Sequence, residues 1–219
     1  MNTVLLFNFL EELSLHNERE WFQAHKATYD QLRKEFEVAV ARWLQQMAAN
    51  DPTLAGLDPK KCLFRIYRDV RFSHDKRPYK THFSAYFSGG GKAGTGPGYY
   101  VQLGPHGQTM MAGGIYVPEK EQLVRIRQEI DYNGPALHAV LRAPAFRQYY
   151  AGLSGEKLKK APAGYSTDHP DVELLKHKSF VVSHQVPDAT VHQLDLDAYV
   201  PAAFRALQPF CEFLREAVD

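Results

Sequence analysis

The chain has few cysteines, no strong charge of either sign and no long hydrophobic run, and each shortage excludes a class of protein. Cys62 and Cys211 are the only cysteines, and neither lies in a Cys-x-x-Cys or Cys/His arrangement. We therefore expect neither a structural zinc site nor a disulfide framework. The formal net charge of +1 argues against nucleic-acid or membrane binding over the whole surface, so any anion site must be local.

No apolar run approaches the ~20 residues that a membrane span needs. The apolar stretch at residues 3–7 is interrupted by Asn8 and Glu11 before the core of a signal peptide could form. We therefore expect no membrane association and a cytoplasmic location.

The motifs of several enzyme classes are also missing. The glycine-rich stretch at residues 89–98 contains neither a P-loop nor a dinucleotide-binding fingerprint, and there is no Gly-x-Ser-x-Gly elbow. Two histidines and a carboxylate, His25, His82 and Asp69, lack the His-x-x-x-His or His-x-His spacing that prepares a metal site. The sequence therefore predicts no metal and no cofactor, and it assigns no catalytic residue.

The sequence does contain a dense basic stretch, FRIYRDVRFSHDKRPYKTHF at residues 64–83, which we name the basic segment. Between Arg65 and His82 lie six Lys or Arg and two Asp, a local balance of six minus two, or +4. Aromatic and aliphatic side chains are interspersed with these charges, and their burial should hold the arginines in a fixed arrangement. Fixed guanidinium groups suit phosphate and carboxylate, so we expect a site for a small anionic, phosphorylated ligand here.

The expected ligand contacts are Arg65, Arg68, Arg71, Lys76 and Lys80. Asp69 should orient the arginines, because a carboxylate between cations has a lowered pKa and is a poor proton acceptor at neutral pH. Tyr67, Tyr79 and His25 should close the pocket, with His25 on the inward face of a helix. Apolar neighbours flank Arg65 and Arg68, so we expect both arginines to be mostly enclosed.

Two other functions stay open from the sequence. One is a nucleic-acid-associated binding module, because a second basic stretch at residues 157–160 and the tyrosines Tyr99, Tyr100, Tyr149 and Tyr150 would suit single-stranded nucleic acid. The other is a protein-interaction domain in which the basic segment is only a structural salt-bridge network. Paired arginines would favour the network, a continuous positive groove the nucleic acid, and a closed pocket the small ligand.

Hydrophobic periodicity predicts helices towards both ends of the chain and strands in its middle. Helices are expected at residues 5–14, 17–47 (with Asn17 and Glu20 as a capping box), 118–134, 136–150 and 196–218. Strands are expected at residues 62–68, 80–88, 99–103, 108–116 and 180–186. Residues 88–98 are expected to form a lid over the basic segment. The prediction is a single α+β domain over residues 1–219, with a mainly antiparallel or mixed sheet flanked by the N- and C-terminal helices.

One longer pattern covers most of the chain. Its centre is residues 65–73 followed by residues 75–83, and it extends upstream to Asn17 and downstream to Gly113 and His169. This pattern resembles the signature of domain-of-unknown-function family 2461, over roughly residues 5–185. The resemblance implies membership of that family and no particular activity, substrate or cofactor.

Overall fold

A computed structural model describes residues 1–91 and 94–219 of the protein. The strands are β1 (Phe83–Phe87), β2 (Gly98–Leu103), β3 (Met110–Ile115), β4 (Leu153–Ser154) and β5 (Phe180–Gln185). They form a five-stranded sheet in the order β1-β2-β3-β5-β4, in which every neighbouring pair is antiparallel. The predicted α+β class and antiparallel sheet are confirmed.

The described helices lie before, between and after the strands of this sheet. They are α1 (Thr3–Leu15), α2 (Arg19–Ala24), α3 (Lys26–Ala48), the 3-10 helix η1 (Pro52–Leu54), α4 (Pro59–Cys62), α5 (Lys120–Arg142), α6 (Pro144–Arg147), α7 (Val172–Leu175), α8 (Asp188–Val191) and α9 (Leu196–Val218). The bounds of α9 are those that the sequence predicted, because a regular apolar stripe runs along its whole length.

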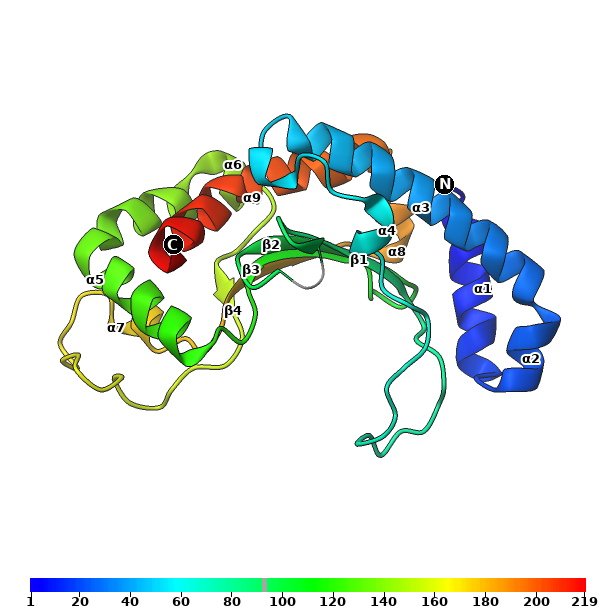
Figure 1. Ribbon diagram of the computed structural model, residues 1–219, viewed down its shortest axis with the longest axis horizontal. Coiled ribbons are helices and arrows are strands. Elements are labelled where there is room, and N and C mark those ends of the chain that lie inside the picture. The colour runs from blue at the N-terminus through cyan, green and yellow to red at the C-terminus, as the bar shows by residue number, and fades with distance from the viewer. Residues whose placement is uncertain (92–93) are drawn as a thin grey trace.

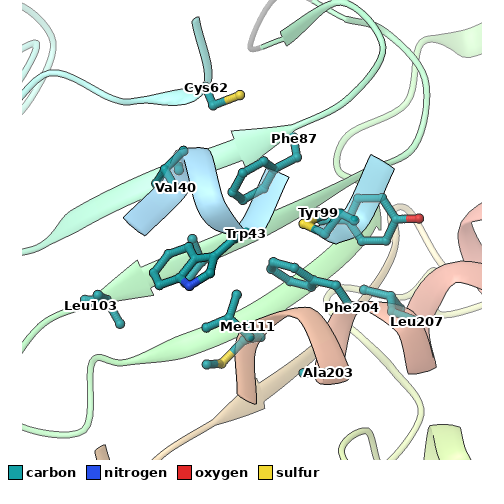
Figure 2. Packing of buried hydrophobic residues seen from close by; sticks show 14 of the residues in the cluster. Val40, Trp43, Cys62, Phe87, Tyr99, Leu103, Met111, Ala203, Phe204 and Leu207 are labelled. Atoms are coloured by element: carbon teal, nitrogen blue, oxygen red, sulfur yellow. The ribbon is translucent and has the colours of Figure 1, made fainter. Parts of the chain in front are cut away.

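Two long helices, α3 and α9, lie over one face of the sheet (Figure 1). Trp43 of α3 and Phe204 of α9 pack against strand residues such as Phe87 and Tyr99, and all four side chains are buried (Figure 2). At Gly113 a Cβ atom would lie 2.5 Å from a methyl carbon of Leu207, so only glycine lets α9 pack this closely. The other face of the sheet points away from both helices.

The helix predicted from residue 17 to residue 47 is broken into α2 and α3. His25, with φ −104° and ψ 13°, lies between the two helices and outside helical geometry. The expected N-cap, Asn17, bonds the backbone of Tyr79 with its side chain instead of capping α2. A tertiary contact has therefore replaced the local capping box that the sequence suggested.

The strand predicted at residues 62–68 is wrong. Cys62 ends α4, and the following residues make only single bridges with later ones, at Leu63–Ala85 and Tyr67–Tyr79. Pro78 has no N–H to donate, so a regular ladder cannot continue past the Tyr67–Tyr79 bridge. The ring of Phe64 lies 6.1 Å from that of Tyr100, on the sheet face away from α3 and α9.

The two helices predicted at residues 118–134 and 136–150 are joined into α5, which is kinked at the predicted boundary. Asn133 has non-helical angles of φ −129° and ψ 28° inside α5. The kink lies over Asp171: a Cβ atom on Gly134 would be 2.3 Å from a carboxylate oxygen of Asp171. The predicted helix end at Asn133-Gly134 is therefore a bend inside α5.

Candidate functional site

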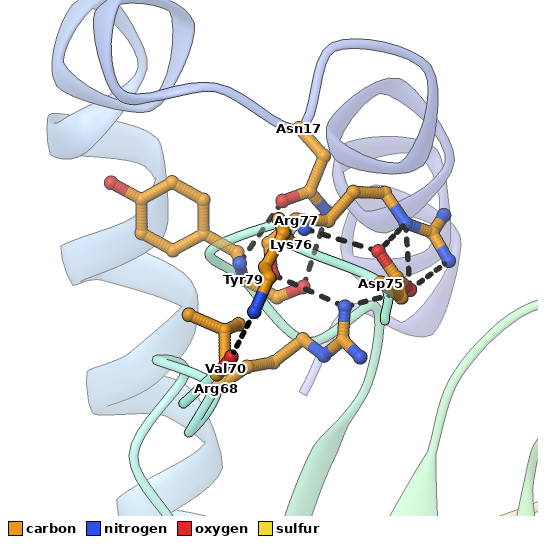
Figure 3. A network of polar contacts seen from close by, with 7 residues as sticks. All are labelled: Asn17, Arg68, Val70, Asp75, Lys76, Arg77 and Tyr79. Carbon is orange, nitrogen blue, oxygen red and sulfur yellow. Dashed lines mark hydrogen bonds and ion pairs between the residues drawn. The ribbon is translucent and has the colours of Figure 1, made fainter. Parts of the chain in front are cut away.

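The basic segment projects from the sheet on the side away from α3 and α9 (Figure 1). It is attached to the turn before α2 through Asn17, whose Nδ2 donates to the carbonyl oxygen of Tyr79 (3.1 Å) while its Oδ1 accepts from the N–H of Tyr79 (3.0 Å). The buried ring of Tyr79 stacks on Phe22 with 4.1 Å between ring centroids. These contacts fix where the C-terminal part of the basic segment lies (Figure 3).

Asp69 orients an arginine, as the sequence predicted. Its carboxylate accepts hydrogen bonds from Nε (3.0 Å) and Nη2 (2.6 Å) of Arg71. Hydrogen bonds from the Arg71 side chain and backbone, with the charges of Arg71 and Arg65, lower the pKa of Asp69 to about 2. Asp69 is therefore ionised at neutral pH, and it neutralises Arg71.

A second carboxylate, Asp75, pairs with two more arginines and compensates one of their two positive charges. It lies 2.8 Å from Nη2 of Arg77 and 2.7 Å from Nη1 of Arg68, and these bonds hold the pKa of Asp75 well below its usual range. Nζ of Lys76 donates to the carbonyl oxygen of Val70 (3.0 Å), which closes the loop between the two aspartates (Figure 3). Most of the charge of the basic segment is thus engaged within it.

Arg65 differs from these arginines because it has no carboxylate partner among the described residues. It lines a hollow at the edge of β1 together with Arg33 of α3, Tyr29 and His82. Arg33 is likewise in no ion pair within the described part of the chain. Two guanidinium groups from distant parts of the sequence therefore border one hollow. The expected enclosure of Arg65 is wrong, since its side chain is exposed. The side chain of Arg68 is mostly enclosed, as expected, with 25% of it exposed.

Lys80 adds positive charge next to this hollow. Its Nζ lies 5.1 Å from the ring centroid of Phe64, a residue that also lines the hollow. Burial, with the nearby charge of Lys80, lowers the pKa of His82 to about 4. At neutral pH the hollow therefore combines cationic side chains with an uncharged imidazole.

His25 is not brought to the place that the sequence predicted. It is exposed, its ring stacks on Trp21 at 3.9 Å, and its Nδ1–H donates to the Trp21 carbonyl oxygen (2.8 Å). Tyr67 and Tyr79 do lie together, with ring centroids 5.4 Å apart. Tyr67 is 47% exposed, so these rings do not enclose a pocket with His25. The break between α2 and α3 accounts for the outward position of His25.

The sequence did not predict a large open cavity of about 770 Å³ on the sheet face opposite α3 and α9. Its walls include Phe64, Tyr86, Tyr100, Ala112 and Ser183. The signal for it was present in the period of two along β1, β2 and β3, where Tyr86, Tyr100 and Ala112 each stand between buried neighbours. That pattern distinguishes two faces but does not say which one the helices cover.

The glycine-rich loop borders this cavity, through Gly94, Thr95 and Gly96. The Thr95 carbonyl oxygen accepts from Nε2 of Gln122 in α5 (3.0 Å). The loop follows the Phe87 end of β1, whereas the basic segment joins the other end (Figure 1). Its described residues therefore do not form the expected lid over Arg65 and Tyr79, and residues 92–93 of that prediction lie outside the described residues.

Most of the side chains expected to form a nucleic-acid surface are buried or are in contact with other residues of the chain. Tyr99 and Tyr150 are buried in the core, and Tyr149 packs against His184 and Tyr199. Nζ of Lys157 forms an ion pair with Glu173 at 3.1 Å. Of the four tyrosines, Tyr100 lines a large cavity, and Tyr99 borders a small hollow beside Asp51 in the described structure.

The described part of the chain contains neither a side-chain cluster for a metal ion nor a helix that could span a membrane. No group of three or more His, Cys, Asp or Glu side chains is arranged to hold a metal ion within residues 1–91 and 94–219. Over the same ranges, no helix is both long and apolar enough to cross a membrane.

Both thiols, Cys62 and Cys211, are buried, and burial raises the pKa of Cys211 to about 12, so neither is placed to act as a nucleophile.

Comparison with known proteins gives one match. No curated protein and no solved structure matches the chain. A family model described as "Conserved hypothetical protein (DUF2461)" matches residues 5–213, nearly the whole chain and all of the basic segment. The protein therefore belongs to the DUF2461 family.

Proposed function

We propose that the protein binds a small anionic, phosphorylated ligand on the surface beside Arg33 and Arg65, over the mouth of a hollow that is itself too narrow for a water molecule. The observation that carries the proposal is that Arg33 and Arg65 line one hollow and that neither is in an ion pair with a carboxylate of the described residues. Guanidinium groups offer several N–H donors in a planar fork, which matches the oxygens of phosphate. Lys80, whose charge helps to lower the pKa of His82, adds to the positive potential there.

The remaining polar residues of the basic segment have a supporting role in this proposal. Arg68, Arg71 and Lys76 are bonded to Asp75, Asp69 and the Val70 carbonyl oxygen, so they hold the shape of the segment. Tyr79 anchors it through Asn17 and Phe22. Of the contacts expected from the sequence, Arg65 and Lys80 stay in the proposed site, and Arg33 joins them.

Titration calorimetry with inorganic phosphate, pyrophosphate and a set of phosphorylated metabolites tests the proposal. Arg65→Gln and Arg33→Gln should each weaken binding about tenfold or more, which is ~1.4 kcal/mol of binding free energy. The matched control is Arg42→Gln, on α3 with Arg33 but paired with Asp197 (2.8 Å), and it should change the affinity less than about twofold. If no anion binds and Arg65→Gln alters only thermal stability, the basic segment is a structural network and the proposal is wrong.

The salt dependence of binding separates a compact anion from nucleic acid. A ligand held by two or three cations should lose affinity modestly with salt, whereas six phosphate contacts would cost ~10³ or more between about 50 and 200 mM. Lys157→Ala, on the second basic stretch, should leave binding of the small anion unchanged. A steep salt dependence together with weakening by Lys157→Ala would support an extended nucleic-acid surface instead.

We further propose that the protein works in the cytoplasm. The two cysteines are buried, free thiols, as is usual for a protein of a reducing compartment. Fractionation of cells that produce the protein checks the location, and recovery in an oxidising compartment would contradict it.

A further inference from the structure

The cavity on the sheet face opposite α3 and α9 is separate from the hollow at Arg33 and Arg65. The two share only Phe64 among the residues that line them. A volume of about 770 Å³ lies within the range of small-molecule sites in proteins, ~300–1,000 Å³. This size is sufficient for a ligand of several rings.

The walls of the cavity are apolar and aromatic. Phe64, Tyr86 and Tyr100 form one side, with Phe64 and Tyr100 at 6.1 Å and steeply inclined to each other. The floor carries small side chains or none, at Ala112, Gly113 and Gly114. Tyr86, Tyr100 and Ala112 are neighbours across β1, β2 and β3, so the aromatic rings stand beside a bare stretch of sheet and favour a flat ligand that packs against them.

The charges around the cavity favour an uncharged ligand. No Lys, Arg or Asp lines it among the described residues, and Glu119 is the one acid there. Glu119 forms a capping box with Gln122 at the start of α5, which engages its carboxylate. An anion would meet no compensating cation on these walls, and burying it would cost free energy.

Backbone constraints on both sides of the cavity show that its shape is built into the fold. Gly114 has φ 114°, and a Cβ atom there would lie 2.0 Å from the Phe180 carbonyl oxygen. At the rim, Val117 has φ 48°, an unfavourable conformation for a β-branched residue, and its N–H donates to Oγ of Ser179 (3.0 Å). Backbone strain of this kind is concentrated at functional sites.

Several groups remain for directional recognition of a ligand. The Tyr100 hydroxyl, which donates to Oε1 of Gln102 (2.7 Å), lies in the wall, and the Ser183 side chain is exposed. We infer that this cavity binds a flat, uncharged, ring-containing small molecule that packs on Tyr86 and Tyr100. The inference does not rest on the proposed anion site.

Two fluorescent probes with the same ring skeleton test this inference. N-phenyl-naphthylamine is uncharged, and anilinonaphthalenesulfonate adds one sulfonate to nearly the same rings. The uncharged probe should bind one-to-one with native protein and at least about threefold more tightly than the sulfonate. No binding of the uncharged probe, or tighter binding of the sulfonate, would overturn the inference.

Matched variants on β5 locate the bound probe. Ser183→Phe places a ring inside the cavity, whereas Gln185→Phe changes another exposed residue two positions along the same strand that does not line it. Ser183→Phe should weaken binding of the uncharged probe about tenfold and Gln185→Phe less than about twofold. Equal effects of the two variants would show that the probe binds elsewhere.

Two controls keep this test decisive. If Ser183→Phe fails to fold, Ala112→Leu on the cavity floor replaces it with the same expectation. Arg65→Gln should leave the affinity for the uncharged probe unchanged, while Ser183→Phe should leave phosphate binding unchanged. Failure of one proposal is thereby distinguished from failure of the other.

Discussion

Asn17 and Tyr79, separated by 62 positions in the chain, form a two-way hydrogen bond between the amide of one and the backbone of the other. Asn17 both donates to and accepts from the peptide groups of Tyr79, as a neighbouring strand would (Figure 3). This contact attaches the basic segment to the turn between α1 and α2. It also explains why Asn17 does not cap the helix that follows it.

Asn17→Ala should therefore destabilise the protein and loosen the basic segment. Two backbone groups of a buried residue lose their partners, which should cost about 2 kcal/mol of unfolding free energy in urea titrations. Limited proteolysis should cut the variant first between residues 67 and 79. Asn50→Ala, which removes one exposed bond to the Gln46 carbonyl oxygen, is the control and should cost less than ~0.5 kcal/mol. Equal losses for the two variants would contradict the anchoring role.

The buried pair of Asp51 and Arg215 should contribute more to stability than any exposed ion pair. Asp51 is 3% exposed and accepts bonds from Nη2 of Arg215 (3.0 Å) and the Tyr99 hydroxyl (2.8 Å). Burial raises the pKa of Asp51, but bonds from Thr53 and Tyr99 and the charge of Arg215 outweigh it, so the net pKa is lowered. Arg215→Met leaves this carboxylate without its cation and should cost ~2–4 kcal/mol.

The control for that measurement is the exposed pair of Arg42 and Asp197, at 2.8 Å. Arg42→Met should lower the unfolding free energy by ~0–1 kcal/mol, because water already screens the pair. Urea titrations of both variants give the comparison. A loss for Arg215→Met no larger than for Arg42→Met would show that the buried pair is neutral for stability.

His82 should make stability fall in mild acid. Its pKa in the folded protein is about 4, below the ordinary value of 6.5, because burial and Lys80 disfavour the charged form. The unfolded chain therefore binds the proton more readily, so the stability contribution is complete above pH 6.5 and is lost as pH falls towards 4. The full shift corresponds to roughly 3 kcal/mol.

Urea titrations of the wild type and His82→Gln at about pH 7 and about pH 4.5 check this. The wild type should lose more stability than the variant between the two conditions, by ~2 kcal/mol. Other acid-sensitive groups contribute equally to both proteins, so the difference isolates His82. Parallel losses in the two proteins would contradict the lowered pKa.

Val117→Gly should stabilise the protein, although valine to glycine usually does the reverse. Val117 is 66% exposed and has φ 48°, so the change removes little packing and relieves backbone strain. We expect a gain of ~0.5–1 kcal/mol in unfolding free energy. Val38→Gly, at an exposed position of helix α3, should cost about 0.5–1 kcal/mol in the same thermal and urea measurements. A loss at both positions would mean that the strain at Val117 is negligible.

The sequence by itself determined the elements that depend on local periodicity. The apolar stripe of α9 predicted its bounds, and the hairpin of β2 and β3 followed from two apolar runs around the turn at Gly104. The pairing of Asp69 with Arg71 was also within reach, because two residues along an extended chain bring a carboxylate beside a guanidinium group. Such features involve neighbours whose separation the backbone geometry already limits.

Only the tertiary structure decided which groups remain available to a ligand. Arg33 and Arg65 lie 32 positions apart, and no local pattern indicates that they border one hollow. His25 lies outward because the predicted helix is broken at this residue. Asn17 bonds the backbone of Tyr79 instead of capping that helix. The cavity beside Tyr100 exists because α3 and α9 both cover the opposite face of the sheet. Alternation along a strand distinguishes two faces, but packing between distant segments decides which one stays open.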